Sequence, residues 1–321
     1  MIGAILLASI SADIGCNHGT MHLDKLTAIG VGIVFFLHGL GLSPKAIKSG
    51  VSHWRMHLFI QLTTFVVYPL LWLLLGDLLQ VYMPSALAIG FCYLLLLPST
   101  VSSSVAMTSL GRGNVPGAVF NASLSMLLGV FLTPLLVQLV IGFSGATLNF
   151  MSVIIALSQQ LLLPIIAGQL LRPILLNTLK KHQSWVNNID KYVILLIVYN
   201  AFCNAIINDI WHAFTPNMLI FSIIICLFLL LFMVKLVRWA ARRCQFLLAD
   251  EVTIVFCGTK KTLVAGIPMA TAIFGNDPHL SMILLPVMLY HPMQIFYCAV
   301  LANRYAKRID GINDTSAIIK S

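Results

Sequence analysis

Two adjacent lysines, Lys260 and Lys261, stand inside an otherwise apolar stretch of the chain. Within a membrane span, a charged side chain costs at least about 2.5 kcal/mol unless it is paired or hydrated, so it marks a functional site by default. Neighbouring residues of a helix point about 100° apart, which predicts that one of the two lysines faces such a site. The nearest carboxylates, Asp250 and Glu251, lie at the start of the same stretch.

The lysines belong to one of two polar interruptions in the apolar sequence. The first interruption consists of Pro98, Ser99, Thr100, Val101, Ser102, Ser103 and Ser104, and the second of Gly258, Thr259, Lys260, Lys261 and Thr262, with Gly266 and Pro268 close behind. Proline removes a backbone donor and glycine weakens a helix, so both segments are expected to unwind. Freed backbone groups bind ions or polar substrates where they line a cavity. The alternative is that these residues are ordinary kinks and helix-packing contacts.

Further polar candidates occur in two neighbouring apolar stretches. One stretch carries Asn121, Ser123 and Ser125, and the other carries His291 and Gln294. Asn121 and Ser125 are four residues apart, so one helix face presents both. These groups bind a ligand, or they serve as hydrogen-bonding contacts between helices.

The other histidines do not predict a metal site. His53 and His57 are four residues apart, but Trp54 and Arg55 between them are typical of a membrane interface. His38 is expected to be a packed, hydrogen-bonding side chain. No metal or other cofactor is therefore predicted from these residues.

The elements that carry the candidate residues are predicted to be transmembrane helices. Of the 321 residues, 59% are hydrophobic and 9% are charged, whereas about 25% of a soluble domain is charged. Apolar runs of about 20 residues follow one another without the alternation of barrel strands. Ten spans are predicted, at 1–13, 26–42, 57–76, 84–110, 114–142, 150–171, 190–207, 217–237, 251–274 and 280–303. The first is expected to be a short or truncated helix, since it lacks the basic region of a signal peptide.

Basic residues gather on one side of this predicted topology. Sixteen of the 19 Lys and Arg residues do so: Lys45, Lys48, Arg55, Arg112, Arg172, Lys180, Lys181, Lys191, Lys235, Arg238, Arg242, Arg243, Arg304, Lys307, Arg308 and Lys320. The positive-inside rule makes that side the cytoplasm, with both termini there, in a bacterial inner membrane. The lipid bilayer thus accounts for the net charge of +9, and nucleic acid is not predicted as a partner.

Ten spans divide into two halves of five, and an odd number per half gives the halves opposite orientations. This arrangement is typical of secondary transporters with inverted repeats, whose binding sites lie at interrupted helices. The predicted repeats are 1–143 and 149–305, followed by a loose cytoplasmic tail at 306–321. The polar interruptions fall in the fourth span of each half.

Three blocks of sequence resemble the bile acid:sodium symporter family, in its divergent SBF-like branch of bacterial transporters. They are 35–45 (FFLHGLGLSPK), 97–133 (LPSTVSSSVAMTSLGRGNVPGAVFNASLSMLLGVFLT) and 250–268 (DEVTIVFCGTKKTLVAGIP). The resemblance implies ten helices in two inverted repeats, with core helices at 57–142 and 217–303 and panel helices at 1–42 and 150–207. It also implies that the broken fourth and ninth helices cross near the membrane centre, beside sodium sites.

The chain departs from the family at the sodium site. Sodium-coupled members carry a glutamate, a glycine two residues on, and then a glutamine and an asparagine. Aligned on Gly258, these positions hold Phe256, Lys260 and Lys261, so the carboxylate is replaced and two ammonium groups repel a cation. The family's ion-binding Ser and Asn of the fourth helix map near Ser103, Ser104 or Val105, because two alignments that differ by one residue fit this segment. Sodium coupling at the family's usual site is therefore not expected, although sodium stays possible elsewhere.

Three roles fit a lysine at this position. It occupies the vacated sodium site as a tethered cation, it binds an anionic substrate with the serine-rich interruption, or it exchanges protons. The sequence thus predicts a secondary transporter for a small organic anion that works by alternating access. The alternatives are a proton-coupled transporter and a membrane regulatory protein without transport. An intramembrane enzyme is not predicted, because no spacing supports a nucleophile with a base, and no oligomeric state is indicated.

Overall fold

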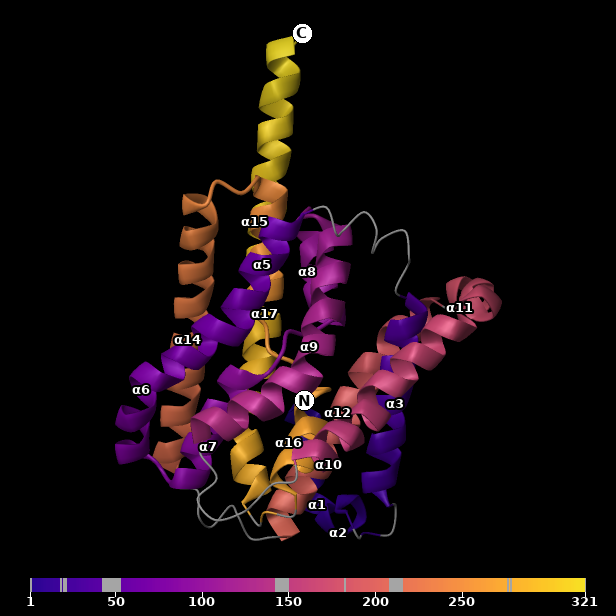
Figure 1. Ribbon diagram of the computed structural model, residues 1–321, viewed down its shortest axis with the longest axis vertical. Coiled ribbons are helices and arrows are strands. Elements are labelled where there is room, and N and C mark those ends of the chain that lie inside the picture. Colours follow the sequence, from indigo (N-terminus) through magenta and orange to yellow (C-terminus); the bar gives the residue numbers. More distant parts are fainter. Residues whose placement is uncertain are drawn as a thin grey trace.

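The structure, a computed structural model, describes residues 2–17, 19, 22–41, 53–141, 150–181, 183–207, 216–275, 277 and 279–320. Within these ranges the chain is helical, with turns, bends and short extended segments between the helices and no strand (Figure 1). The predicted all-α class therefore holds for the described residues.

The helices follow one another with short connections. The first part of the chain contains α1 (Ile2–Ile10), α2 (Ala12–Gly15), α3 (Leu23–Gly41), α5 (Trp54–Leu62), η1 (Thr63–Val67), α6 (Tyr68–Tyr82), α7 (Ser85–Leu96), α8 (Ser102–Leu110) and α9 (Val115–Ile141). The second part contains α10 (Phe150–Leu157), η2 (Ser158–Leu162), α11 (Leu163–Lys181), α12 (Gln183–Ile207), α14 (Pro216–Arg243), α15 (Leu248–Gly258), α16 (Gly266–Phe274) and α17 (Leu280–Lys320). The segments η1 and η2 are π-helical turns inside longer helices.

Six stretches of the described helices are long and apolar enough to cross a bilayer. They are Leu23–Gly41, Trp54–Tyr82, Val115–Val140, Phe150–Leu175, Asn217–Arg243 and Leu280–Arg308, and two shorter apolar helices are Ser85–Leu96 and Lys191–Ile207. Helix α1 has 9 residues and rises about 14 Å, roughly half the hydrocarbon thickness of a bilayer. The protein is a multi-pass membrane protein, and the number of ten spans stays a prediction.

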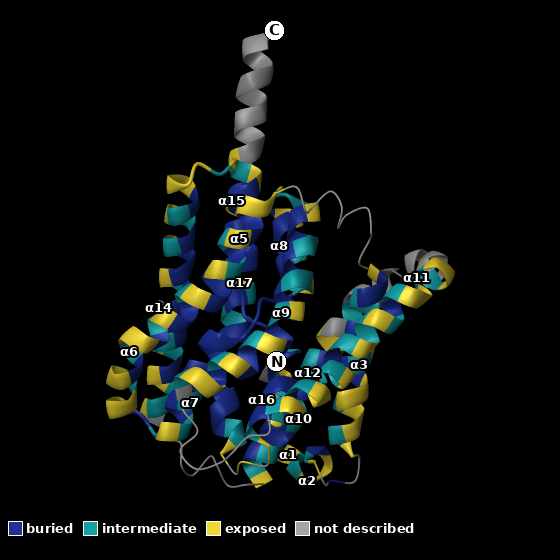
Figure 2. Ribbon diagram, in the orientation of Figure 1, coloured by how far each residue is buried: buried dark blue, intermediate teal, exposed yellow. Residues whose placement is uncertain are grey.

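The outward faces of the long helices are apolar. Leu74 of α6, Leu170 of α11 and Ile224 of α14 are all exposed, as are many other large hydrophobic side chains. Figure 2 shows exposed residues along the outer faces of these helices and buried ones on the segments between them. Such a surface suits contact with lipid chains, whereas in water it would be an aggregation liability.

Both predicted interruptions coincide with ends of helices. Helix α7 ends at Leu96, and Leu97 is extended, with φ −69° and ψ 149°. This conformation is expected, because the residue before a proline is disfavoured in the α region. Helix α8 begins at Ser102, and in the second half α15 ends at Gly258 before α16 begins at Gly266.

Helix α3 packs closely along α11, and glycines permit the approach. A Cβ atom added at Gly39 would collide with the carbonyl of Ile165, and one added at Gly168 would collide with the carbonyl of Phe36. Small residues allow membrane helices to approach at backbone distance. Helix α12 also packs on α3 and on α1, so these four helices form one group in the fold.

The C-terminal segment differs from its prediction as a loose tail. Helix α17 runs on from Leu280 to Lys320 without a break, although Pro286 and Pro292 lie within it (Figure 1). The residues after Arg304 include no proline that would end the helix. The helix therefore extends beyond the apolar stretch that ends near Arg308.

Candidate functional site

The two interruptions lie directly against each other. The N–H of Thr262 donates to the carbonyl of Pro98 at 3.1 Å, which joins the two segments through their backbones. The hydroxyl of Ser104 donates to the carbonyl of Phe256 at 3.1 Å, and the hydroxyl of Tyr93 donates to that of Gly266. Residues about 160 positions apart in the sequence thus form one polar junction within the apolar core.

Lys261 points into the first half of the protein and is 1% exposed. Its Nζ donates to the carbonyl oxygens of Leu97 at 2.7 Å, Leu95 at 2.8 Å and Thr64 at 3.4 Å. The same Nζ lies 3.9 Å from the centroid of the Tyr68 ring, within range of a cation–π interaction. All three hydrogens of the ammonium group therefore have an acceptor.

Lys260 points elsewhere and has fewer partners. It is fully buried, and its Nζ donates to the carbonyl of Ser103 at 2.7 Å. The ring of Phe256, which stands at the family's carboxylate position, has its centroid 5.9 Å from this Nζ. Within the described part of the chain, Ser103 is its one hydrogen-bond partner.

Neither lysine pairs with a carboxylate among the described residues. The carboxylates at the start of α15 are engaged elsewhere. Asp250 accepts from Asn114 at 2.9 Å and lies 3.4 Å from Nδ1 of His53. Glu251 accepts from Arg242 at 3.0 Å and from the hydroxyl of Tyr305 at 2.8 Å. In the described structure, no carboxylate therefore lies beside either lysine of the junction.

Gln294 holds the backbone at Lys261. Its Oε1 accepts from the N–H of Lys261 at 2.9 Å, and its Nε2 donates to the carbonyl of Lys261 at 2.8 Å. Nε2 also lies 3.0 Å from Nδ1 of His291. Because the amide nitrogen is a donor, Nδ1 of His291 accepts, and the neutral imidazole carries its proton on Nε2.

The resulting Nε2–H of His291 is a buried donor without an acceptor in the described structure. The side chain is 3% exposed, and its Nε2 has no hydrogen-bond partner. An unmet buried donor costs about 1–3 kcal/mol and calls for an explanation such as a ligand. A second buried donor of the junction is the ammonium group of Lys260, which bonds to Ser103.

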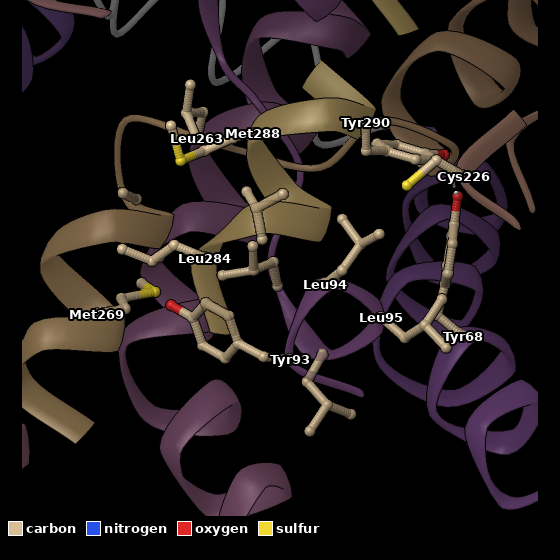
Figure 3. Close-up of a cluster of buried hydrophobic side chains, with 14 of the residues drawn as sticks. Tyr68, Tyr93, Leu94, Leu95, Cys226, Leu263, Met269, Leu284, Met288 and Tyr290 are labelled. Atoms are coloured by element: carbon tan, nitrogen blue, oxygen red, sulfur yellow. Dashed lines mark hydrogen bonds between the residues drawn. The ribbon is translucent and has the colours of Figure 1, made fainter. Parts of the chain in front are cut away.

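Two tyrosines fix the end of α15. The hydroxyl of Tyr68 donates to the carbonyl of Thr259 at 2.8 Å, and that of Tyr290 donates to the same oxygen at 3.1 Å. Figure 3 shows the hydroxyls of Tyr68 and Tyr290 close to each other, beside Cys226, in a cluster of buried side chains. The carbonyl freed where the helix stops is therefore satisfied by side chains rather than by water.

The serine-rich interruption is held by its own neighbours. The N–H of Ser99 donates to Oγ of Ser125 at 3.0 Å, and the hydroxyls of Thr100 and Ser103 are 2.7 Å apart. The hydroxyl of Ser99 is buried and has no partner in the described structure. Ser125, one of the polar candidates of its helix, thus contacts the first interruption.

Asn121 and Ser123 lie outside the junction. Asn121 bonds to α5, with its Nδ2 2.7 Å from Nδ1 of His57 and its Oδ1 accepting from Gln61 at 3.3 Å. Ser123 donates to the carbonyl of Val119 at 2.9 Å. Ser123 also lines a small cavity of about 30 Å³, together with Phe35, His38, Val101, Met126, Leu127 and Ile165.

Several residues at the junction have no counterpart in the predicted site. His38 of α3 meets the start of α8, where its Nε2 lies 2.8 Å from Oγ of Ser102. Tyr68 and the carbonyls of Thr64, Leu95 and Leu97 surround Lys261. Tyrosine and histidine within an apolar span are a sequence signal that points to such contacts, but backbone carbonyls carry none.

Comparison with known proteins identifies the family of the chain. Residues 1–307 match the SBF-like CPA transporter family. The chain is 44% identical over 311 residues to an uncharacterised protein of Pseudomonas aeruginosa, covering 97% of this chain and 92% of the relative. It is 42% identical over 287 residues to the Escherichia coli protein named "Putative symporter YfeH", covering 89% and 86%. It is also 32% identical over 311 residues to sodium/bile acid cotransporter 7 of Danio rerio, covering 94% and 91%. With this match and these relatives, the chain belongs to the SBF-like CPA transporter family, and the names of the family and of the last two relatives describe transporters rather than enzymes.

Proposed function

We propose that the protein is a secondary transporter that carries a small organic anion across the bacterial inner membrane by alternating access. The observation that carries the proposal is the junction of the two interruptions, which buries two ammonium groups without a carboxylate partner in the described structure. Buried charge is stable only when it is compensated, and a substrate carboxylate supplies the missing negative charge.

Lys260 and His291 are the groups proposed to meet this anion. An ammonium group has three donors, and Ser103 takes one of those of Lys260. The Nε2–H of His291 lacks an acceptor, and Gln294 fixes its orientation. A carboxylate accepts two such bonds at once, and charge-assisted bonds of this kind are about twice as strong as neutral ones.

Alternating access is proposed to follow from the predicted inverted repeats. In such transporters one group of helices moves against the other around a site at interrupted helices. We assign the role of the panel to the group formed by α1, α3, α11 and α12, which pack on one another. The two interruptions belong to the helices outside this group. Both termini are proposed to face the cytoplasm, as the distribution of Lys and Arg indicates.

Proton coupling is a second candidate, which the burial of Lys260 and His291 favours. Both side chains can exchange protons, and neither pairs with a carboxylate in the described structure. A proton bound there would take the place of the sodium ion as the coupling ion. Phe256 at the family's carboxylate position argues against sodium at that point.

The test is uptake into proteoliposomes from a panel of radiolabelled monocarboxylates and dicarboxylates. Uptake is measured with a sodium gradient, with a proton gradient and without a gradient. The proteins compared are the wild type, Lys260→Met and the control Lys235→Met, which replaces an exposed lysine on α14. We expect uptake by the wild type that persists when choline replaces sodium, a loss of at least about tenfold in Lys260→Met, and no loss in the control. Folded wild type that moves none of the anions under any gradient would favour a regulatory role instead.

A further inference from the structure

We infer that the carbonyl oxygens of Thr64, Leu95 and Leu97 form a site for a monovalent cation, which Lys261 keeps filled with its own ammonium group. The inference concerns the coupling of the proposed transporter, but it requires neither a known substrate nor a transport assay. Of the three roles considered for the buried lysines, it assigns that of a tethered cation to Lys261 and names the atoms that hold it. We call these three oxygens, with the ring of Tyr68, the carbonyl cage.

The geometry of the carbonyl cage is that of a cation site. Three carbonyl oxygens, one from η1, one from α7 and one from the extended residue after α7, converge on one nitrogen at 3.4, 2.8 and 2.7 Å. The ring of Tyr68 closes a further side, with its centroid 3.9 Å from this nitrogen. Rings of backbone carbonyls replace the hydration shell of monovalent cations in selective pores. The face of an aromatic ring also attracts a cation.

Two of the oxygens are open because α7 ends beside them. The last carbonyls of a helix have no intrahelical donor, and the helix dipole adds partial negative charge at this end. Leu95 lies in the last turn of α7, and Leu97 follows it in an extended conformation set by Pro98. The end of α7 therefore presents two unsatisfied acceptors to whatever cation stands there.

The third oxygen is open because of a π-helical turn. In an α-helix the N–H of Tyr68 would donate to Thr64, but in η1 it donates to Thr63, five residues back. The next residue, Pro69, has no N–H to offer. The carbonyl of Thr64 is thus left without its helical donor, and Lys261 supplies one. Such π-turns are frequent at functional sites.

The cage contains no formal negative charge, which makes it a site for one weakly held positive charge. Asp250 and Glu251, at the start of α15, are engaged instead with His53, Asn114, Arg242 and Tyr305. The ammonium group of Lys261 is attached to the chain and already fills the cage. Sodium and potassium should therefore not change the stability of the wild type. Removing the tether should leave an empty cage that a free cation can enter.

The experiment compares thermal unfolding of purified protein in detergent with chloride salts of choline, sodium, potassium or ammonium at constant ionic strength. Lys261→Ala should unfold at least about 2 °C lower than the wild type in choline, and one of the small cations should restore it with a saturating dose response. Lys260→Ala is the matched control, since it removes an equally buried lysine that has a single carbonyl partner. It should show no cation response. Lys261→Met, whose side chain occupies the cage, should show none either.

The alternatives are distinguishable from one another and from failure of the proposed function. A cation response in wild type or in Lys260→Ala equal to that of Lys261→Ala would overturn the inference, as would its absence in all variants. If Lys261→Ala does not fold in choline, the yield of monodisperse protein in each salt replaces the unfolding temperature. Recovery in a small cation supports the cage, and recovery in none overturns it. Absence of transport by the wild type would leave these results unchanged.

Discussion

At the residue scale, two neighbours in the sequence serve different surroundings because the backbone between them is fixed. Gln294 pairs with both the N–H and the carbonyl of Lys261, so the chain there cannot rotate freely. Lys261 then reaches the carbonyls beside α7, and Lys260 reaches Ser103 on α8. The two lysine side chains therefore point in different directions, although they lie after the end of α15 and not in a helix.

Replacing Gln294 should therefore destabilise the protein. Gln294→Leu fills a similar volume but leaves the buried N–H and carbonyl of Lys261 without partners, at a cost of about 1–3 kcal/mol for each group. Thermal unfolding in detergent should show a lower midpoint, whereas Gln80→Leu, at an exposed position on α6, should leave it unchanged. Equal midpoints for the two variants would contradict the role given to Gln294.

The sequence identified the side chains of the junction better than their partners. Lys260, Lys261, His291 and Gln294 were all candidates, and the structure brings them together. The partners of Lys261 are carbonyls, which every residue possesses, so no residue type marks Thr64, Leu95 or Leu97 in advance. A site made of side chains can be predicted from residue types. A site made of backbone oxygens can be recognised only once the fold is known.

At the element scale, the interruptions were predictable from local sequence, and their surroundings were not. Pro98 explains the end of α7, and Gly258 stands at the end of α15. Asn121 and Ser125 share a helix face, but they lie about 6 Å apart along α9. Only Ser125 reaches the interruption, because one turn farther along the same face α9 meets α5 instead.

The packing of α9 on the first interruption gives a prediction for that element. A Cβ atom at Gly129 would lie 2.6 Å from Cγ of Pro98, so the ring or the helix must move. Gly129→Ala should lower stability by about 1–3 kcal/mol, as overpacking does. Gly32→Ala on α3 is the matched control, since a Cβ there meets nothing within 4 Å. An unchanged midpoint of thermal unfolding for Gly129→Ala would contradict this prediction, because it would show that Pro98 or α9 can shift without loss of stability.

At the scale of the whole molecule, hydrophobicity determines the class of the protein, and charge determines its proposed orientation. Helices of 26 to 29 residues among the candidate spans are long enough to cross a bilayer with some tilt. Helix α1 and the interrupted segments are too short to meet the same criterion, so length alone does not fix ten spans. Apolar composition predicts where helices lie, but not how far each one reaches through the bilayer.

The orientation itself can be measured through a native cysteine. Cys244 is exposed in the turn after α14, next to Arg242 and Arg243, so the positive-inside rule places it in the cytoplasm. A membrane-impermeant maleimide should label Cys244 in inside-out vesicles and not in intact spheroplasts. Gln80→Cys in a Cys244→Ser background lies at the other end of the fold, at an exposed position near the end of α6, and should show the reverse pattern. The two sites must report opposite sides, because the chain between them crosses the membrane an odd number of times in the predicted topology. Labelling of Cys244 from outside would mean that the proposed membrane orientation is reversed. The side of the junction that is proposed to face the cytoplasm would then face the periplasm.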